Sequence, residues 1–320
     1  MELIIRDYDA SLFQQVIQLF VMEYGVEEKS FGEYFRTFYE HPFQKERCIR
    51  AVAMDGQKLA GFQTFFFWPY LYKGKEYNSY QSGNSLVHPD YRGKGIFAKL
   101  LTFVEEKAQK SNIDFLMGFP VEASYGSFIR KKWSNVLNLQ WYVKRSSFLS
   151  PLLSHTEKKL NHVFSSPDYL PSSSSAEIIR LHHSKDFCEW RKAYQKNTPY
   201  YQYVFKKGTS DEVRLTVKFQ TRKKYLKEMV IGDLEYGNLD ASVLKFAVAE
   251  LCKAVTSKHL ATFVSIALNP ADEVLLKHVE SIGFKKIEKK IYFIHKPIKD
   301  LPELDVAAHW KLYRSDIDTW

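Results

Sequence analysis

A short loop with two glycines constrains this chain more than any other feature of its sequence. Tyr77 to Val87 before it predict a strand, and Gly95 to Lys110 predict a helix because their apolar residues recur at helical spacing. Gly93 and Gly95 lack Cβ atoms, so the loop backbone can approach a ligand closely. A helix that begins there directs unpaired N–H groups and its positive dipole end at the loop. The segment therefore predicts an anion site, and a diphosphate fits it.

The elements predicted around this loop indicate a mixed α/β chain. Strands are expected at Leu3 to Arg6, Ile49 to Met54, Lys58 to Tyr70 and Ile113 to Phe119, and helices from Asp9 or Ser11 and over Phe31 to Tyr39. The loop follows an antiparallel meander, which excludes a Rossmann fingerprint, and no Gly-Lys-Ser/Thr follows Gly95, which excludes a Walker motif. We expect an α/β fold of the α+β kind, a mainly antiparallel twisted sheet flanked by helices.

The composition is that of a folded, basic protein. Hydrophobic residues make up 45% of the 320 positions and aromatic residues 16%, which is enough for a packed core in two domains or one large one. The formal net charge of +9 favours anionic partners. The basic residues are scattered in short groups, so no nucleic-acid partner is expected. The most apolar run, Gly61 to Tyr72, is too short to span a bilayer, so no membrane partner is expected either.

The cysteines and the first residues bear on the compartment. Cys48, Cys188 and Cys252 are far apart and form no CxxC motif, so neither a disulfide framework nor a metal site is predicted. Glu2 and Asp7 stand where a secretory signal would be basic and then apolar. A cytoplasmic location is therefore expected.

Four segments are expected along the chain. Residues 1–146 form the lobe with the glycine loop, residues 147–175 a Ser- and Pro-rich connection, residues 176–297 a second lobe and residues 298–320 a C-terminal tail. The second lobe repeats the plan of the first in weakened form. Its expected helices are Asp186 to Tyr194, Ala241 to Ser257 and Ala271 to Ile282, and its expected strands include Ala261 to Ala267 and Lys285 to His295.

The glycine loop also carries a resemblance to a known family. Arg92 and Gly95 fit the signature R/Q-x-x-G-x-G/A of the GNAT family of acyl-CoA-dependent N-acyltransferases, and the preceding Val-x-Pro-x-Tyr-Arg is similar to that family. The resemblance covers residues 1–145 well and 176–297 weakly, which implies a tandem GNAT-like fold. It implies acetyl-CoA as co-substrate, held by Leu86, Val87, Arg92, Gly93, Lys94, Gly95, Ile96 and Phe97. Phe97 departs from the family's Gly or Ala and marks a subfamily.

The second lobe resembles the family in fold more than in chemistry. Its counterpart of the loop, Tyr236 to Asp240, lacks the Arg and the paired glycines. Asn269-Pro270 and Gly283-Phe284 still resemble the family's closing segment. We therefore expect a degenerate second lobe that forms one wall of the substrate cleft.

Candidate catalytic residues follow from the same resemblance. The family's Tyr, which protonates the departing thiolate, falls on Phe128, so Tyr125, nearly one turn earlier, is the candidate acid. Glu122, just past the strand that ends at Phe119, is the candidate base. Gln81 and Asn84 on the preceding strand are candidates for orienting substrate or water.

These features together predict transfer of an acetyl group from acetyl-CoA to a primary amine of a small molecule, such as an amino sugar or an antibiotic-like amine. One alternative is transfer of a longer acyl chain from an acidic acyl carrier protein, which the basic charge balance and the many aromatic residues favour. Another is a degenerate GNAT module that binds its ligand without turnover. No motif in the sequence fixes the oligomeric state.

Overall fold

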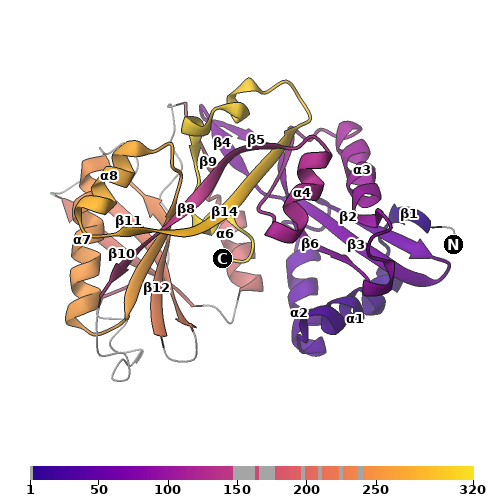
Figure 1. Ribbon diagram of the computed structural model, residues 1–320, viewed down its shortest axis with the longest axis horizontal. Coiled ribbons are helices and arrows are strands. Elements are labelled where there is room, and N and C mark those ends of the chain that lie inside the picture. Colours follow the sequence, from indigo (N-terminus) through magenta and orange to yellow (C-terminus); the bar gives the residue numbers. More distant parts are fainter. Residues whose placement is uncertain are drawn as a thin grey trace.

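One sheet runs through both halves of the computed structural model, which describes residues 3–146, 163–165, 177–195, 199–207, 211–222, 226–236 and 241–320 (Figure 1). From the first half come β1 (Leu3–Asp7), β2 (Cys48–Asp55), β3 (Lys58–Phe67), β6 (Ser79–Val87), β7 (Phe115–Gly118) and β8 (Ser134–Arg145). From the second half come β10 (Tyr200–Lys207), β11 (Asp211–Arg222), β12 (Leu226–Glu235), β13 (Phe263–Leu268) and β14 (Lys285–Pro297). Their order is β1-β2-β3-β6-β7-β14-β8-β13-β12-β11-β10.

Except for α4 (Glu122–Arg130), for which no bounds are predicted, the helices begin and end near the predicted positions. They are α1 (Phe13–Tyr24), α2 (Glu28–Tyr39), α3 (Ile96–Gln109), α4 (Glu122–Arg130), α6 (Lys185–Tyr194), α7 (Ala241–Ser257) and α8 (Glu273–Ser281). α2 starts earlier than predicted because the Glu27 carboxylate accepts hydrogen bonds from the first backbone N–H groups of the helix and caps it. Within the described residues, no helix combines the length and the apolar character needed to cross a membrane.

The first-half helices cover the two faces of the sheet. Successive residues of a strand point to opposite faces. On β3, Phe62 contacts Phe35 of α2, at 5.9 Å between ring centroids, whereas a Cβ on the neighbouring Gly61 would meet Ile96 of α3 at 3.0 Å. α1 and α2 therefore cover one face, and α3 covers the other. α4 lies beside α3, because Lys131 after α4 hydrogen-bonds to Thr102 of α3.

The two halves exchange their last strands at the centre of the sheet. β14 pairs with β7, where Ile294 lies opposite Gly118, and also with β8. β8 in turn pairs with β13, where Phe263 lies opposite Arg145. The sheet therefore continues without a break from one half to the other. The segment boundaries at 146, 175 and 297 stay a prediction, and of the predicted connection 147–175 only Val163 to Ser165 lie among the described residues.

A smaller sheet and the C-terminal tail join the halves further. β15 (Trp310–Lys311), β9 (Ile179–Leu181), β4 (Tyr70–Tyr72) and β5 (Lys75–Tyr77) form a four-stranded sheet in that order. The tail includes the short helices η4 (Pro302–Asp305), η5 (Ala307–His309) and η6 (Arg314–Asp316). Trp310 is buried against Phe293 of β14, at 4.6 Å between ring centroids. The indole of Trp320 lies so close to Gly232 that a Cβ there would be 1.9 Å from the ring.

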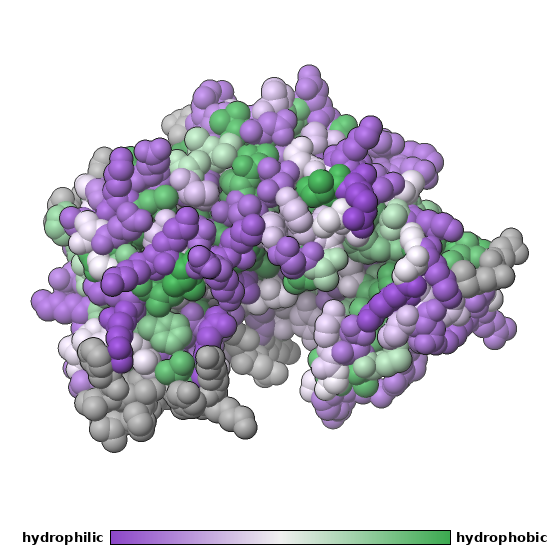
Figure 2. All heavy atoms as spheres, in the orientation of Figure 1, coloured by the Kyte–Doolittle hydropathy of each residue, from purple (hydrophilic) through white to green (hydrophobic). Residues whose placement is uncertain are grey.

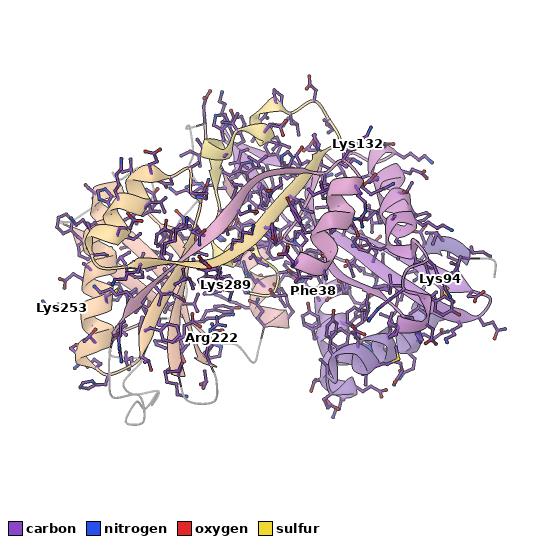
Figure 3. All side chains as sticks on the ribbon, in the orientation of Figure 1. Phe38, Lys94, Lys132, Arg222, Lys253 and Lys289 are labelled. Atoms are coloured by element: carbon purple, nitrogen blue, oxygen red, sulfur yellow. The ribbon has the colours of Figure 1, made fainter. Side chains whose placement is uncertain are left out.

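α2 of the first half meets α6 of the second half in an aromatic contact. Phe38 lies between the halves (Figure 3), with its ring centroid 4.8 Å from that of Trp190 and 4.7 Å from that of Tyr194. The space-filling view is hollowed between the halves on the side of α2 (Figure 2). The fold thus places the sheet, α2, α6 and the C-terminal tail around one region.

Candidate functional site

The sheet opens between β6 and β7. These strands are parallel and pair from Ser79 opposite Phe115 to Ser82 opposite Gly118. β7 then ends, while β6 continues to Val87 and no strand among the described residues pairs with its last residues on that side. Asn84 has a φ of 46°, and the register with β3 shifts at this point, which is a β-bulge. Leu86 and Val87, two of the predicted cofactor residues, therefore line an opening in the sheet.

The glycine loop lies at the outer end of this opening. β6 is followed by the short helix η2 (Pro89–Tyr91), then by Arg92 to Gly95 and α3. Gly93 and Gly95 have φ values of 78° and 70°, which an L residue adopts only at a cost. Gly95 precedes α3 and no side chain caps the helix, so the first N–H groups of α3, at Ile96 and Phe97, face the loop.

The loop has room and charge for a diphosphate. A Cβ built on Gly93 or Gly95 meets no protein atom within 4 Å, and the loop residues are exposed. Arg92 donates from Nε to the Val87 carbonyl at 3.3 Å and forms an ion pair with Glu23 at 2.5 Å. Lys94 donates to the Asp90 carbonyl at 3.0 Å and is labelled on this loop in Figure 3. Two cations and free helix amides therefore meet at one exposed turn, which fits an anionic cofactor.

The two departures from the family pattern pack against each other. Phe97 replaces the family's small residue on α3, and Phe128 replaces its Tyr on α4. Their rings meet edge to face, with 5.3 Å between centroids, and Phe128 also contacts Trp133 at 4.9 Å. The bulky Phe97 is therefore directed toward α4 and fills space beside the helix.

The candidate acid and base lie together with a residue that sequence reasoning missed. Tyr125 stacks on Tyr292 of β14, with 4.2 Å between ring centroids. The Tyr292 hydroxyl donates to the Glu122 carboxylate at 2.6 Å, and this hydrogen bond, with burial, raises the pKa of Tyr292. Tyr292 comes from 170 positions beyond Glu122, so no local pattern could have joined them.

The side chains of Gln81 and Asn84 lie on the face of the sheet that α2 covers, opposite to the face of α3 and α4. Asn84 donates to the hydroxyl of Tyr39 on α2 at 2.7 Å. Gln81 donates to the carboxylate of Asp318, in the C-terminal tail, at 3.0 Å. Burial raises the pKa of Asp318 to about 6, against the opposing effect of Arg314. Asp318 is a second residue that sequence reasoning missed, because only the fold brings the tail to β6.

A cavity of about 400 Å³ adjoins Asp318 between α2 and α6. Glu33, Tyr34 and Thr37 line it from α2, Tyr194 from α6, and Asp318 and Trp320 from the tail. The cavity therefore lies on the α2 face of the sheet, whereas the glycine loop leads into α3 on the other face.

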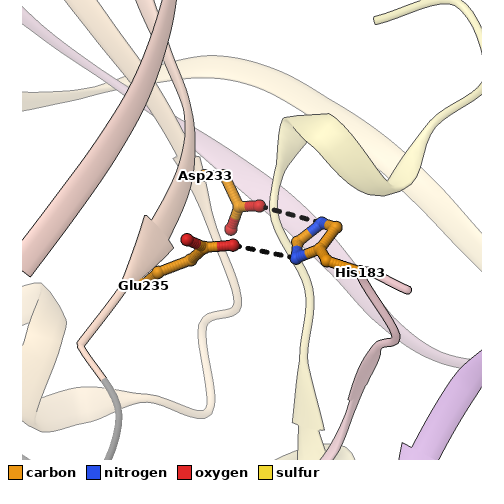
Figure 4. A group of neighbouring side chains, drawn as sticks. All are labelled: His183, Asp233 and Glu235. Atoms are coloured by element: carbon orange, nitrogen blue, oxygen red, sulfur yellow. Dashed lines mark ion pairs between the residues drawn. The ribbon is translucent and has the colours of Figure 1, made fainter. Parts of the chain in front are cut away.

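Another group of titratable side chains lies in the second half (Figure 4). His183 Nε2 is 3.2 Å from Asp233, and its Nδ1 is 3.0 Å from Glu235. Burial lowers the pKa of His183 to about 4, so its imidazole is neutral. The potential metal-binding atoms of these three residues lie within 4.8 Å of one another, in the one such group that the described part of the chain contains. The adjacent His182 pairs with Glu76 instead.

Comparison with known proteins gives a family match for the first part of the chain. Residues 4–132 match the acetyltransferase (GNAT) domain family. No curated protein sequence matches the chain.

Solved structures match over nearly the whole chain. A GCN5-related N-acetyltransferase from Anabaena variabilis has a TM-score of 0.63 at 11% identity, over 93% of this chain and 73% of that one. A tandem GNAT protein from the clavulanic acid biosynthesis pathway has a TM-score of 0.55 at 12% identity, over 94% of this chain and 100% of that one. N-myristoyltransferase from Saccharomyces cerevisiae, with bound myristoyl-CoA, has a TM-score of 0.54 at 12% identity, over 92% of this chain and 82% of that one.

These similarities confirm the expected fold class, a mixed α/β sheet flanked by helices and built from two lobes. The resemblance read from Arg92 to Gly95 is confirmed at the level of the family. The chain therefore carries a GNAT acetyltransferase domain at residues 4–132, within a two-lobed acyl-CoA N-acyltransferase fold.

Proposed function

We propose that this protein transfers an acetyl group from acetyl-CoA to a primary amine of a small molecule such as an amino sugar or an antibiotic-like amine. The match of residues 4–132 to the GNAT acetyltransferase domain family supports an acyltransferase. The observation that carries the proposal is the opening between β6 and β7, which leads from the exposed Gly93 and Gly95 turn to the end of β7 at Gly118. A thioester donor with an anionic end fits such a path.

The chain's own groups would hold the donor at two places. Arg92, Lys94 and the N–H groups at the start of α3 would bind the diphosphate, with Gly93 and Gly95 keeping the backbone accessible. The unpaired edge of β6 at Leu86 and Val87 would hydrogen-bond the pantetheine arm. The donor supplies an activated acetyl group as a thioester.

Tyr125 is our candidate for protonating the departing thiolate. It lies on the first turns of α4, directly after the β7 end of the opening, and its ring is held by stacking on Tyr292. The neighbouring Glu122 carboxylate accepts the Tyr292 hydroxyl hydrogen bond at 2.6 Å. Glu122 therefore serves best as a residue that positions Tyr292, and the base has to be found elsewhere.

The test is acetyl transfer itself. The protein is incubated with acetyl-CoA and a panel of amines that contains glucosamine, spermidine and kanamycin, while free thiol is measured with a thiol reagent and products by mass spectrometry. We expect thiol release equal to the acetylated amine formed. Release only from acyl carrier protein would contradict acetyl-CoA as the donor, and binding of acetyl-CoA without turnover of any amine would contradict an enzyme. The cytoplasmic location stays a prediction.

A further inference from the structure

We propose that Asp318 is the general base that accepts a proton from the acceptor amine, and that the amine enters through the cavity between α2 and α6. This inference rests on the proposed function, because it concerns the second substrate of the same transfer. It adds a catalytic residue from the C-terminal tail, outside the GNAT domain at residues 4–132.

Asp318 lies where the two strands separate. Its Oδ1 accepts a hydrogen bond from Gln81 at 3.0 Å, and its Oδ2 would be 3.0 Å from a Cβ on Gly83. These two residues flank Ser82, the last residue of β6 that pairs with β7. The carboxylate can approach the strand this closely only because position 83 is a glycine. Asp318 is therefore held against the backbone at the inner end of the opening.

The two faces of the sheet divide the two substrates. The glycine loop leads into α3 and α4, the face where Gly61 meets Ile96. Gln81 and Gly83 instead face the aromatic side chains of α2, since a Cβ on Gly83 would lie 2.6 Å from the Phe66 ring and Phe66 packs on Phe38. The donor would approach from the α3 side and the amine from the α2 side, and they would meet at the opening.

The cavity has the lining that an ammonium ion prefers. Its volume is about 400 Å³, enough for a small polar molecule. The charged side chains among its described lining residues are Glu33 and Asp318, both acidic. Tyr34, Tyr194 and Trp320 supply aromatic faces, which attract cations. The cavity therefore favours a protonated amine that carries hydroxyl or other polar groups.

The surroundings of Asp318 suit a base near neutral pH. Burial raises the pKa of Asp318 to about 6, and Arg314, Arg191 and nearby backbone N–H groups oppose this rise. Burial also raises the pKa of Tyr34 and Tyr194 well above the ordinary value, so these neighbours stay neutral. The titratable groups that face Asp318 are Tyr34 and Tyr39 from α2, Arg191 and Tyr194 from α6, and Arg314 from the tail. A carboxylate with this pKa is mostly ionised at pH 7 and is a better base than an exposed aspartate.

The proposed step balances as follows. The ammonium form of the acceptor gives one proton to the Asp318 carboxylate and becomes a neutral amine. The amine nitrogen forms a bond to the acetyl carbon, and the bond between that carbon and the CoA sulfur breaks. Tyr125, the candidate acid, gives its hydroxyl proton to the departing thiolate, and the second proton of the nitrogen replaces it on Tyr125. Asp318 then releases its proton to water, so the products are the acetylamide, CoA and one proton.

The experiment compares Asp318→Asn with the wild type. Asn has the same shape and can still accept the Gln81 hydrogen bond, so the fold should persist, and thermal unfolding checks this. Glu189→Gln removes an exposed acidic side chain of α6 that is not among the described lining residues of the cavity, and it is the matched control. The acceptors are the amine found in the panel above, glucosamine first, and hydroxylamine, a weakly basic amine that is already unprotonated near neutral pH.

We expect Asp318→Asn to lower kcat/KM for glucosamine by about 100-fold or more, the range of general base catalysis, with an unchanged Kd for acetyl-CoA. Hydroxylamine should be acetylated at nearly the wild-type rate, because it needs no base. In the wild type, kcat/KM should rise with pH up to about 6 and then level off, whereas in Asp318→Asn it should keep rising until the amine itself is neutral.

Three results would overturn the inference. Asp318→Asn with wild-type kcat/KM and pH profile excludes the base, and an equal loss for both acceptors shows a structural role only. An equal loss in Glu189→Gln would also count against it, because the effect would then not depend on a carboxylate at the cavity. Failure of the proposed function looks different: the wild type itself would acetylate no amine.

Discussion

At the scale of single residues, Phe97 and Phe128 are the two departures from the GNAT pattern near the glycine loop. Both are larger or less polar than the family's residues, and their rings contact each other at 5.3 Å. The contact keeps Phe97 beside α4 and removes the usual Tyr hydroxyl at the same time. For the proposed proton transfer, Tyr125 is the candidate hydroxyl, and its stacked neighbour Tyr292 carries a second one.

Tyr125→Phe tests which hydroxyl acts. Loss of a general acid costs about 100-fold or more in rate, so we expect kcat for amine acetylation to fall by that factor while the Kd for acetyl-CoA stays the same. Tyr292→Phe keeps the stacked ring, removes the hydrogen bond to Glu122 and should lower kcat much less. Steady-state kinetics and a calorimetric titration measure both quantities. A larger loss in Tyr292→Phe would assign the acid to Tyr292 instead.

A turn at Gly93 and Gly95 could be predicted from the sequence because its constraint is local. Gly93 and Gly95 take left-handed φ values because a tight turn precedes a helix, and the sequence of that turn is contiguous. The places of Tyr292 and Asp318 could not be predicted, since each makes its contacts across a long separation in the chain: Asp318 contacts Gln81 over 237 positions. Tyrosines are common in strands and aspartates are common in tails, so no local sequence pattern marks either residue.

At the scale of elements, the residue range of β14 could be predicted from the sequence, but its neighbours in the sheet could not. The apolar and basic pattern predicts a strand at Lys285 to His295, and β14 covers Lys285–Pro297. Its neighbours β7 and β8 lie far away in the chain, and only the closed packing of both halves selects them. The position brings Tyr292 to α4 and buries His295 in the centre of the sheet.

His295 should make the stability of the protein depend on pH. Its side chain is fully buried, and burial lowers its pKa to about 4, against a partly compensating effect of Asp305. Between about pH 6.5 and pH 4 the unfolded chain binds a proton at this residue and the folded chain does not. The free energy of unfolding therefore falls as the pH falls, by about 1.4 kcal/mol for each pH unit from this group. Above about pH 6.5 the group contributes no pH dependence.

Urea unfolding of the wild type and of His295→Gln at several pH values measures this effect. Both proteins contain the same other titrating groups, including Asp316, whose raised pKa acts in the opposite direction. The difference between their unfolding free energies should therefore change with the slope due to His295 alone. Parallel curves from pH 7 to pH 4 would show that His295 is protonated in the folded state.

At the scale of the whole molecule, one sheet runs through both of the lobes that the sequence predicts, and we expect them to unfold as one unit. The weak repeat in the sequence predicts two GNAT-like halves, and the solved tandem GNAT structure is similar in fold over 94% of this chain. The exchange of β8 and β14 has no sequence signature, because each strand looks the same whichever sheet it joins. The C-terminal tail contacts β6 and lines the cavity at Asp318. Its aromatic residues alone do not indicate where it packs.

Phe293→Ala tests this shared sheet. Phe293 is fully buried on β14 and contacts Trp310 and Phe119. Truncation of a buried Phe costs about 3 to 5 kcal/mol, and we expect that loss in urea unfolding. Far-ultraviolet circular dichroism and tryptophan fluorescence should give one coincident transition in both proteins, shifted together by the substitution. Two separate transitions, of which only one shifts, would show that the halves unfold independently.

The most direct measurement is a calorimetric titration of acetyl-CoA into three proteins. Gly95→Glu places a Cβ and a negative charge at the start of α3, where the φ is 70° and the diphosphate would bind. Gly74→Glu is the matched control, because Gly74 has a φ of 76° in the exposed turn between β4 and β5. We predict a binding heat for the wild type, an unchanged Kd for Gly74→Glu and a Kd at least about tenfold weaker for Gly95→Glu, which corresponds to about 1.4 kcal/mol. No binding to the wild type, or equal Kd values in all three, would contradict an acyl-CoA site at this loop.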